Sequence, residues 1–183
     1  MVLPVYVIGS KILKKEAEEI EKNYEGLNQL IEDMFETMYK SDGVGLAAPQ
    51  IGKSIRMFVV DATPMGDEDP SLKTFKKVFI NAYITDYLGE KLYYNEGCLS
   101  VPGVREDVQR FEKIKIEYFD ENFKFHEEEF EGVRAWIIQH EYDHLDGILF
   151  VDKLSSIRKK LIKSKLKTIA SGDFEASYKA KIA

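Results

Sequence analysis

The feature that most constrains this chain is the stretch 133–147, in which apolar residues fall on nearly every side of a helix. A helix that is apolar on most of its faces has to lie inside the folded protein. Gly147 follows the last apolar residue and supplies a C-terminal stop for such a helix. The rest of the chain must therefore fold around this segment, which carries two of the three histidines, His140 and His144.

The spacing of these histidines indicates a metal site. His140 and His144 stand four residues apart, so a helix places both imidazoles on one face, one turn above the other. Two such imidazoles can hold one zinc-like ion, while the neighbouring Glu141 remains free to accept a proton from water, as in the H-E-x-x-H arrangement of metal-assisted hydrolysis. The pattern alone is equally consistent with a core helix in which His140 and Glu141 form a hydrogen-bonded pair.

A catalytic site of the zinc type uses three protein ligands and leaves one position open, so a third ligand is needed. The histidine that some proteases place six residues after the second one is absent, because Phe150 occupies that position. Two candidates remain: Glu175, in a polar tail, and Cys98, the chain's single cysteine. Cys98 is the stronger candidate, because a thiolate beside a cation is deprotonated and binds strongly. With Glu175 as ligand the chain would be a different metallohydrolase, a peptidase. A third interpretation is a non-catalytic protein that keeps the cluster for its structure.

The remaining sequence predicts an α+β fold, with short, mostly antiparallel strands packed around a central metal-binding helix and with N-terminal and C-terminal helices. The periodicity predicts helices at 11–40 and from about residue 155, and strands at 56–60, 78–84, 114–118 and 123–127. Turn-forming residues predict an exposed loop at 61–72 and turns at 86–89 and 120–122. The glycines and proline of 41–52 exclude a continuous helix there and let the backbone approach a ligand.

Composition favours one globular domain over residues 1–183, of which 44% are hydrophobic and 32% charged. No run approaches the roughly 18 apolar residues of a membrane helix and no secretory signal is present, so we expect a cytoplasmic protein without a membrane partner. The single cysteine suits a reducing compartment. A net charge of −6 argues against binding to DNA, although residues 153–167 contain seven lysines and arginines and no acid.

Three short motifs together resemble those of the peptide deformylase family. They are GVGLAAPQ at 43–50, EGCLS at 96–100 and QHEYDH at 139–144. They occur in the family's order and at family-like separations. The likeness extends over the whole chain, and the 61–72 loop is its weakest part.

The resemblance implies a hydrolase that removes the formyl group from the N-terminal formylmethionine of newly synthesised polypeptides and releases formate. It implies Cys98, His140 and His144 as ligands of one divalent metal ion. Fe(II) is the usual native metal of the family, and zinc, nickel or cobalt can occupy the site. Spacing alone would have suggested zinc.

The resemblance also assigns catalytic roles. Glu141 would accept a proton from the attacking water and pass it to the departing amine. The side-chain amide of Gln50 and the backbone N–H of Leu99 would join the metal in stabilising the oxyanion. Glu96 is expected to shape its loop, and its carboxylate could accept a hydrogen bond behind the ligands.

For the methionine side chain we expect an apolar pocket beside the metal, and the resemblance places there Val44, Tyr94, Val133, Trp136 and Ile137. Each of these five is also consistent with an ordinary core position. Gly45 and Gly103 would leave room for the peptide backbone, and Arg105 would lie at the rim.

The basic segment near the C-terminus has two interpretations. In the first, Leu154, Ile157 and Leu161 dock an amphipathic helix on the domain while its lysines face solvent. In the second, the lysines additionally contact ribosomal RNA near the nascent chain. We expect the docking, hold the ribosome contact as a hypothesis, and expect a monomer.

Overall fold

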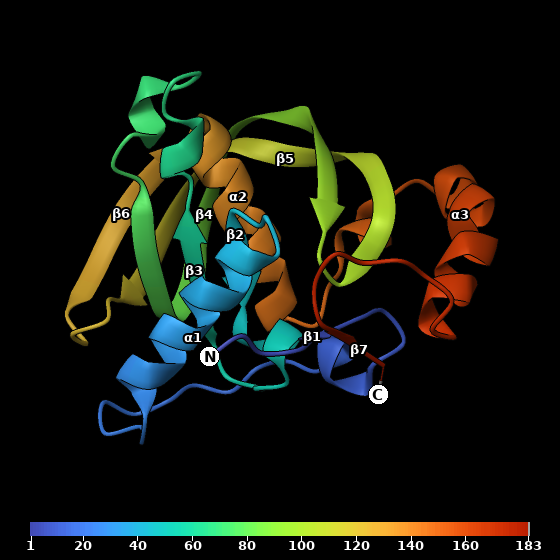
Figure 1. Ribbon diagram of the computed structural model, residues 1–183. Coiled ribbons are helices and arrows are strands. Elements are labelled where there is room, and N and C mark those ends of the chain that lie inside the picture. Colours follow the sequence, from blue (N-terminus) through green and yellow to red (C-terminus); the bar gives the residue numbers. More distant parts are fainter. Residues whose placement is uncertain (183) are drawn as a thin grey trace.

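The computed structural model describes residues 1–182 and is organised around a five-stranded antiparallel sheet with the strand order β2-β3-β4-β5-β6 (Figure 1). The strands of this sheet are β2 Gly45–Ala47, β3 Met57–Asp61, β4 Lys76–Cys98, β5 Val101–Phe119 and β6 Phe125–Glu131. The helices are α1 Leu27–Lys40, α2 Gly132–Leu145 and α3 Ser156–Ala170. A short parallel pair joins β1 Val5–Tyr6 to β7 Ala180–Lys181.

This arrangement confirms the expected α+β fold built on antiparallel strands. The strands are not all short, however, because β4 has 23 residues and β5 has 19. None of the helices among residues 1–182 has the length and apolar character that a membrane crossing requires.

Strand β3 shows how the sheet divides the core. Successive strand residues point to opposite faces, and all of β3 is buried. Phe58 and Val60 pack in the hydrophobic cluster that contains α2, whereas Met57 and Val59 pack in the cluster that contains α1. The sheet therefore has α2 on one face and α1 on the other.

Helix α2 is the buried helix predicted from the apolar run, and it ends where predicted. Its buried residues extend from Ala135 to Leu145 and include polar side chains. Gly147, just past the helix, adopts φ +71°, and a Cβ there would lie 2.7 Å from the backbone of Lys14. Only glycine fits this combination of left-handed backbone and close contact.

The helix predicted over 11–40 is wrong for its first half. Residues Lys11–Lys14 form a single 3-10 turn, and the regular helix starts only at Leu27. Between them the backbone bonds to distant segments: the Ala17 N–H donates to the Leu145 carbonyl at 2.7 Å, and the Glu18 N–H donates to the Ser54 carbonyl at 3.0 Å. Such long-range pairing overrides the helix propensity of a lysine- and glutamate-rich stretch.

The turn predicted at 86–89 is also wrong, because β4 runs through it. Gly89 does adopt a positive φ of 74°, but the chain absorbs it as a register shift between Leu88 and Lys91 rather than as a reversal. The reversal comes at Leu99 and Ser100, which join β4 to β5. The hairpin predicted around 120–122 is confirmed as the β5–β6 connection.

Helix α3 confirms the predicted basic helix, but its docked face is a different one. Leu154, just before the helix, is buried as expected. Ile157 and Leu161, expected to dock, are 72% and 66% exposed, and Ile162 and Ile169 are buried instead. The docked face packs in the cluster that contains Val101, Val104 and Val108 of β5.

Candidate metal centre

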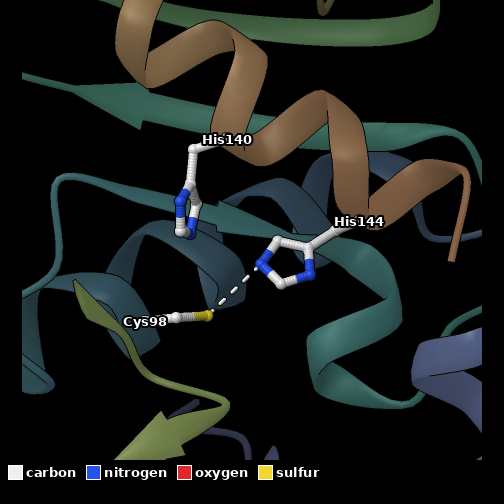
Figure 2. A group of neighbouring side chains, drawn as sticks. All are labelled: Cys98, His140 and His144. Carbon is white, nitrogen blue, oxygen red and sulfur yellow. Dashed lines mark hydrogen bonds between the residues drawn. The ribbon is translucent and has the colours of Figure 1, made fainter. Parts of the chain in front are cut away.

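Three side chains that are far apart in the sequence converge beside α2. Cys98 is the last residue of β4, and His140 and His144 project from adjacent turns of α2 toward it (Figure 2). Their ligand atoms all lie within 4.8 Å of one another, and Cys98 Sγ lies 3.4 Å from His144 Nε2. The other histidine, His126, lies on β6 with its Nε2 2.7 Å from Asp120 Oδ2. The expected trio is therefore assembled, and His126 is not part of it.

A buried carboxylate orients the first imidazole. Glu96 Oε2 lies 2.7 Å from His140 Nδ1, which leaves Nε2 of that ring for the site. Glu96 also accepts hydrogen bonds from Arg110 at 2.7 and 2.9 Å and from the Trp136 indole at 3.0 Å. Burial raises the pKa of Glu96, but the bonds from Arg110 and His140 outweigh it and lower the pKa to about 2. Glu96 thus stays ionised, in the acceptor role expected for it.

The two imidazoles have opposite protonation tendencies in the protein alone. Burial lowers the pKa of His140, but its interactions with Cys98 and Glu96 outweigh burial and hold the pKa well above the ordinary value. Burial lowers the pKa of His144 well below its ordinary value, and the neighbouring His140 adds to that effect. His140 would have to give up this proton to serve as a ligand, since a metal-bound imidazole is neutral.

Glu141 is the carboxylate positioned to accept and donate a proton. It is buried next to the trio, and burial raises its pKa to about 7. A Cβ on Gly45 would lie 2.4 Å from Glu141 Oε1. The missing side chain of Gly45 therefore leaves room for this carboxylate, in addition to any room it leaves for a peptide backbone.

Gln50 and Leu99 flank the sulfur. Gln50 is buried in a 3-10 turn, Ala48–Ile51, where its Oε1 accepts the Ala47 N–H at 2.9 Å. This bond turns its Nε2 toward Ser100 Oγ at 3.1 Å and toward Cys98 Sγ at 3.5 Å. Leu99 follows Cys98 directly in the connection between β4 and β5. Both expected oxyanion donors are thus next to the ligand sulfur.

Cys98 and His140 of the trio line a cleft of about 590 Å³. Of the residues expected to bind methionine, Val44, Trp136 and Ile137 line it. Gly45 and Gly103, expected to leave room for the peptide backbone, and Arg105, expected at the rim, line it as well. Tyr94 and Val133 are not among the lining residues of the described chain. Tyr94 stacks on Trp136 with ring centroids 4.7 Å apart, and Val133 packs against the core cluster around α2. Tyr94 therefore supports Trp136 in the cleft wall, and Val133 is part of the core.

The cleft has lining residues that the sequence did not indicate. Met65 comes from the 61–72 loop, which was expected to be exposed but buries Leu72 completely. Residues 175–178 come from the segment after α3. Glu175 is therefore near the site, but the metal-ligand cluster found among residues 1–182 contains Cys98 in its place. Apart from Glu175, which its residue type had made a candidate, no local pattern marks these positions, because only the folded chain brings them to the cleft.

The donor set fits a divalent transition metal. One thiolate and two imidazoles form a three-ligand set of the kind that leaves a position open for chemistry. Within residues 1–182, Oε2 of Glu141 and Nδ1 of His144 are buried without a hydrogen-bond partner. A buried carboxylate oxygen with no partner beside a ligand trio fits a proton acceptor for water at that position.

Comparisons of sequence and of structure with known proteins all match this chain to deformylases. The family model described as polypeptide deformylase matches residues 2–160. A peptide deformylase of Christiangramia forsetii is 50% identical over 98% of this chain and 95% of its own, and one of Flavobacterium psychrophilum is 49% identical over 100% and 97%. Among solved structures, a peptide deformylase from Legionella pneumophila superposes with a TM-score of 0.80 at 38% identity, covering 92% of this chain and 95% of that one.

Proposed function

This chain belongs to the polypeptide deformylase family, whose members are metal-dependent and remove the N-formyl group from nascent peptides, and we propose that Cys98, His140 and His144 are its metal ligands. The observation that carries the assignment is the convergence of these three ligand atoms within 4.8 Å beside the buried carboxylate of Glu141. A divalent ion held there supplies Lewis-acid chemistry, which polarises a carbonyl and makes water more acidic.

The chain's own residues then have defined tasks. Glu141 accepts the proton of the water that attacks the formyl carbon, and a pKa near neutrality suits both this step and the return of the proton. When the C–N bond breaks, Glu141 delivers the proton to the departing nitrogen. The products are formate and a peptide with a free amino group.

The negative charge that develops on the formyl oxygen needs hydrogen-bond donors. Gln50 Nε2 and the Leu99 N–H are the proposed donors, because both groups lie next to Cys98 in the cleft. The bond that Gln50 Oε1 accepts from Ala47 fixes the amide orientation before substrate arrives.

We propose that Val44, Trp136 and Ile137 contact the methionine side chain, since they line the cleft beside the ligands. The flat stack of Tyr94 on Trp136 keeps the indole in place. Gly45 shapes the same wall by admitting Glu141.

For the native metal we propose Fe(II), as the family resemblance suggests, with zinc, nickel or cobalt able to replace it. The sulfur and nitrogen donors suit all four ions. The iron form should lose activity on exposure to air as the metal and Cys98 oxidise, while a zinc-substituted sample keeps its own activity. Full activity of the natively loaded protein after prolonged exposure to air would contradict the iron assignment.

The test of function is formate release from a formyl-Met peptide by anaerobically prepared protein, with metal analysis on the same sample. Cys98→Ser should lose both metal and activity. Glu141→Gln should keep its metal and lose about 10²- to 10⁴-fold in turnover. Glu175→Gln is the matched control and should keep its metal. Metal loss in the Glu175 variant, but not in the Cys98 variant, would favour the peptidase alternative.

We further propose a monomeric, cytoplasmic enzyme in which residues 1–183 form one domain.

We also propose a ribosome contact through α3. The exposed Ile157 and Leu161 lie on a helix rich in lysine, which suits a partner with both phosphate and apolar surface. Cosedimentation with ribosomes should weaken when Lys159 and Lys160 are neutralised and when salt is raised. Unchanged cosedimentation would contradict the contact, and light scattering tests the monomer.

A further inference from the structure

The segment after α3 returns to the catalytic cleft. In Figure 1 it appears in dark red, running from the end of α3 back toward β1 near the N-terminus. Residues 175–178 line the cleft, and the next residues form β7, which pairs in parallel with β1. Residues 175–178 thus form a wall of the site.

This segment holds the loop that follows the ligand sulfur. The Tyr178 hydroxyl donates to the Leu99 carbonyl at 2.6 Å. From the other end of the chain, the Ile8 N–H donates to the Ser100 carbonyl at 2.7 Å. The two consecutive carbonyls after Cys98 are therefore held from outside the sheet, by residues more than seventy positions away along the chain.

The same loop is held from inside the site. The Ser100 N–H donates to Cys98 Sγ at 3.4 Å, and Ser100 Oγ accepts a hydrogen bond from Gln50. A shift of the backbone at Leu99 would therefore move three groups together: Cys98 Sγ, the Leu99 N–H and the Ser100 hydroxyl that Gln50 bonds. The Tyr178 bond is the outer restraint nearest to these groups.

Tyr178 is itself well anchored. On its N-terminal side, Phe174 packs against the cluster that contains Val101 and Val104. On its C-terminal side, the Val5 N–H donates to the Lys179 carbonyl at 2.8 Å. Tyr178 is half-buried, and burial raises its pKa to about 12, so its hydroxyl remains a donor at neutral pH.

We propose that Tyr178 is a positioning residue for deformylation. By holding the Leu99 carbonyl, it keeps Cys98 Sγ directed at the two imidazoles that complete the ligand set, and it keeps the Leu99 N–H directed at the reacting carbonyl. This inference rests on the proposed roles of Cys98 and Leu99. Since Tyr178 acts on groups that matter most when charge develops on the oxygen, its hydroxyl should affect turnover more than substrate binding.

The experiment compares Tyr178→Phe with Tyr6→Phe, in the full-length, metal-loaded protein. Both changes remove one hydroxyl and keep the ring. Tyr6 bonds Lys181 at 3.0 Å, so its variant also weakens the tail but leaves the Leu99 carbonyl held. Tyr178→Phe should lower kcat for a formyl-Met peptide about threefold to tenfold, the worth of one neutral hydrogen bond, with KM and metal content unchanged. Tyr6→Phe should match the wild type.

A second measurement does not depend on activity. Amide hydrogen exchange of the peptide spanning residues 95–103 should become faster in Tyr178→Phe and stay unchanged in Tyr6→Phe, because only the first change releases the loop. A wild-type kcat together with wild-type exchange in Tyr178→Phe would overturn the inference. So would a loss of kcat that only follows a loss of metal, since that would be a purely structural effect.

Failure of the proposed function would look different. If the wild-type protein released no formate, the assigned reaction would be wrong. The exchange comparison would still decide whether Tyr178 holds the loop.

Discussion

At the scale of single residues, Gln50 connects the 43–50 segment to the loop that carries the ligand sulfur. Gln50→Ala should reduce kcat about 10²- to 10³-fold, as loss of one oxyanion donor does, while metal content falls much less. The measurement is formate release alongside metal analysis, with Gln29→Ala on the exposed face of α1 as control. Equal losses of turnover and metal would show that Gln50 only supports the metal loop.

Asp61, at the end of β3, gives a pH-dependent prediction remote from the metal ligands. Its carboxylate accepts hydrogen bonds from Thr63 and Tyr39, each hydroxyl at 2.6 Å. Burial raises the pKa of Asp61, but the bonds from Thr63 and Tyr39 outweigh it, so the pKa is lower in the folded protein than normal. A depressed folded-state pKa stabilises the protein above the ordinary pKa and stops doing so as the pH falls.

Asp61→Asn should therefore lower the free energy of unfolding by about 1–3 kcal/mol at neutral pH, the worth of hydrogen bonds to a charged group. The difference in unfolding free energy between the variant and the wild type should decrease as the pH drops below the ordinary carboxyl pKa of about 3.9. Urea unfolding of both proteins over a pH series measures it. If the difference in unfolding free energy between the two proteins stayed constant down to acid pH, the ionised form of Asp61 would contribute nothing to stability.

At the scale of elements, the β4–β5 hairpin and α2 build the site together. The hairpin delivers Cys98 at its tip, and its register with β5 sets where that tip lies. Buried Arg110 on β5 bonds Glu96 on β4 and Asp143 on α2, which ties the helix to the hairpin. The ligands thus sit on two regular elements joined by a buried ionic network, and the site does not depend on loop order alone.

Helix α3 offers a direct test of which face docks. Ile162→Ala should lower the free energy of unfolding by about 2–5 kcal/mol, because it leaves a cavity beneath the helix. Leu161→Ala, one position earlier and exposed, should change it by less than about 0.5 kcal/mol. Denaturant titrations of the two variants make the comparison. A larger loss in Leu161→Ala than in Ile162→Ala would indicate that α3 docks by its Ile157–Leu161 face instead.

At the scale of the whole molecule, a metal ion held by Cys98, His140 and His144 would link the end of β4 to α2. Because the ion binds the folded chain far better than the unfolded one, a chelator should lower the thermal midpoint, by an amount that corresponds to about 3 kcal/mol if the ion is present at a hundred times its Kd. Thermal unfolding with and without chelator measures this. Cys98→Ser serves as control and should not respond. A wild-type midpoint indifferent to the chelator would argue against a metal that contributes to stability.

The fold was predictable where local pattern and tertiary role agree. The apolar run through α2 requires burial whatever surrounds it, and the histidine spacing within it follows from helix geometry alone. The period-two stretches of β5 and β6, with the Asp120 turn between them, are equally local. The three motifs then identified the family, the ligands and Glu141 as an expectation.

Prediction failed where distant contacts outweigh local preference. Residues 15–26 favour helix by composition, yet the Ala17 and Glu18 N–H groups bond to the Leu145 and Ser54 carbonyls. Strand β4 passes through the expected turn at 86–89 because β5 pairs along it. Whether Ile157 is exposed and whether Tyr94 packs on Trp136 depend on how whole elements pack, which the local sequence does not show.

The sequence by itself determined the buried helix, the ligand types and their spacing within that helix, since these follow from the 3.6-residue period. Only the tertiary structure decided that Cys98 meets the imidazoles, that Gly45 makes room for Glu141, and that Tyr178 reaches the Leu99 carbonyl. Such contacts join residues tens of positions apart, and their geometry is set by the packing and register of whole elements, which no local pattern encodes.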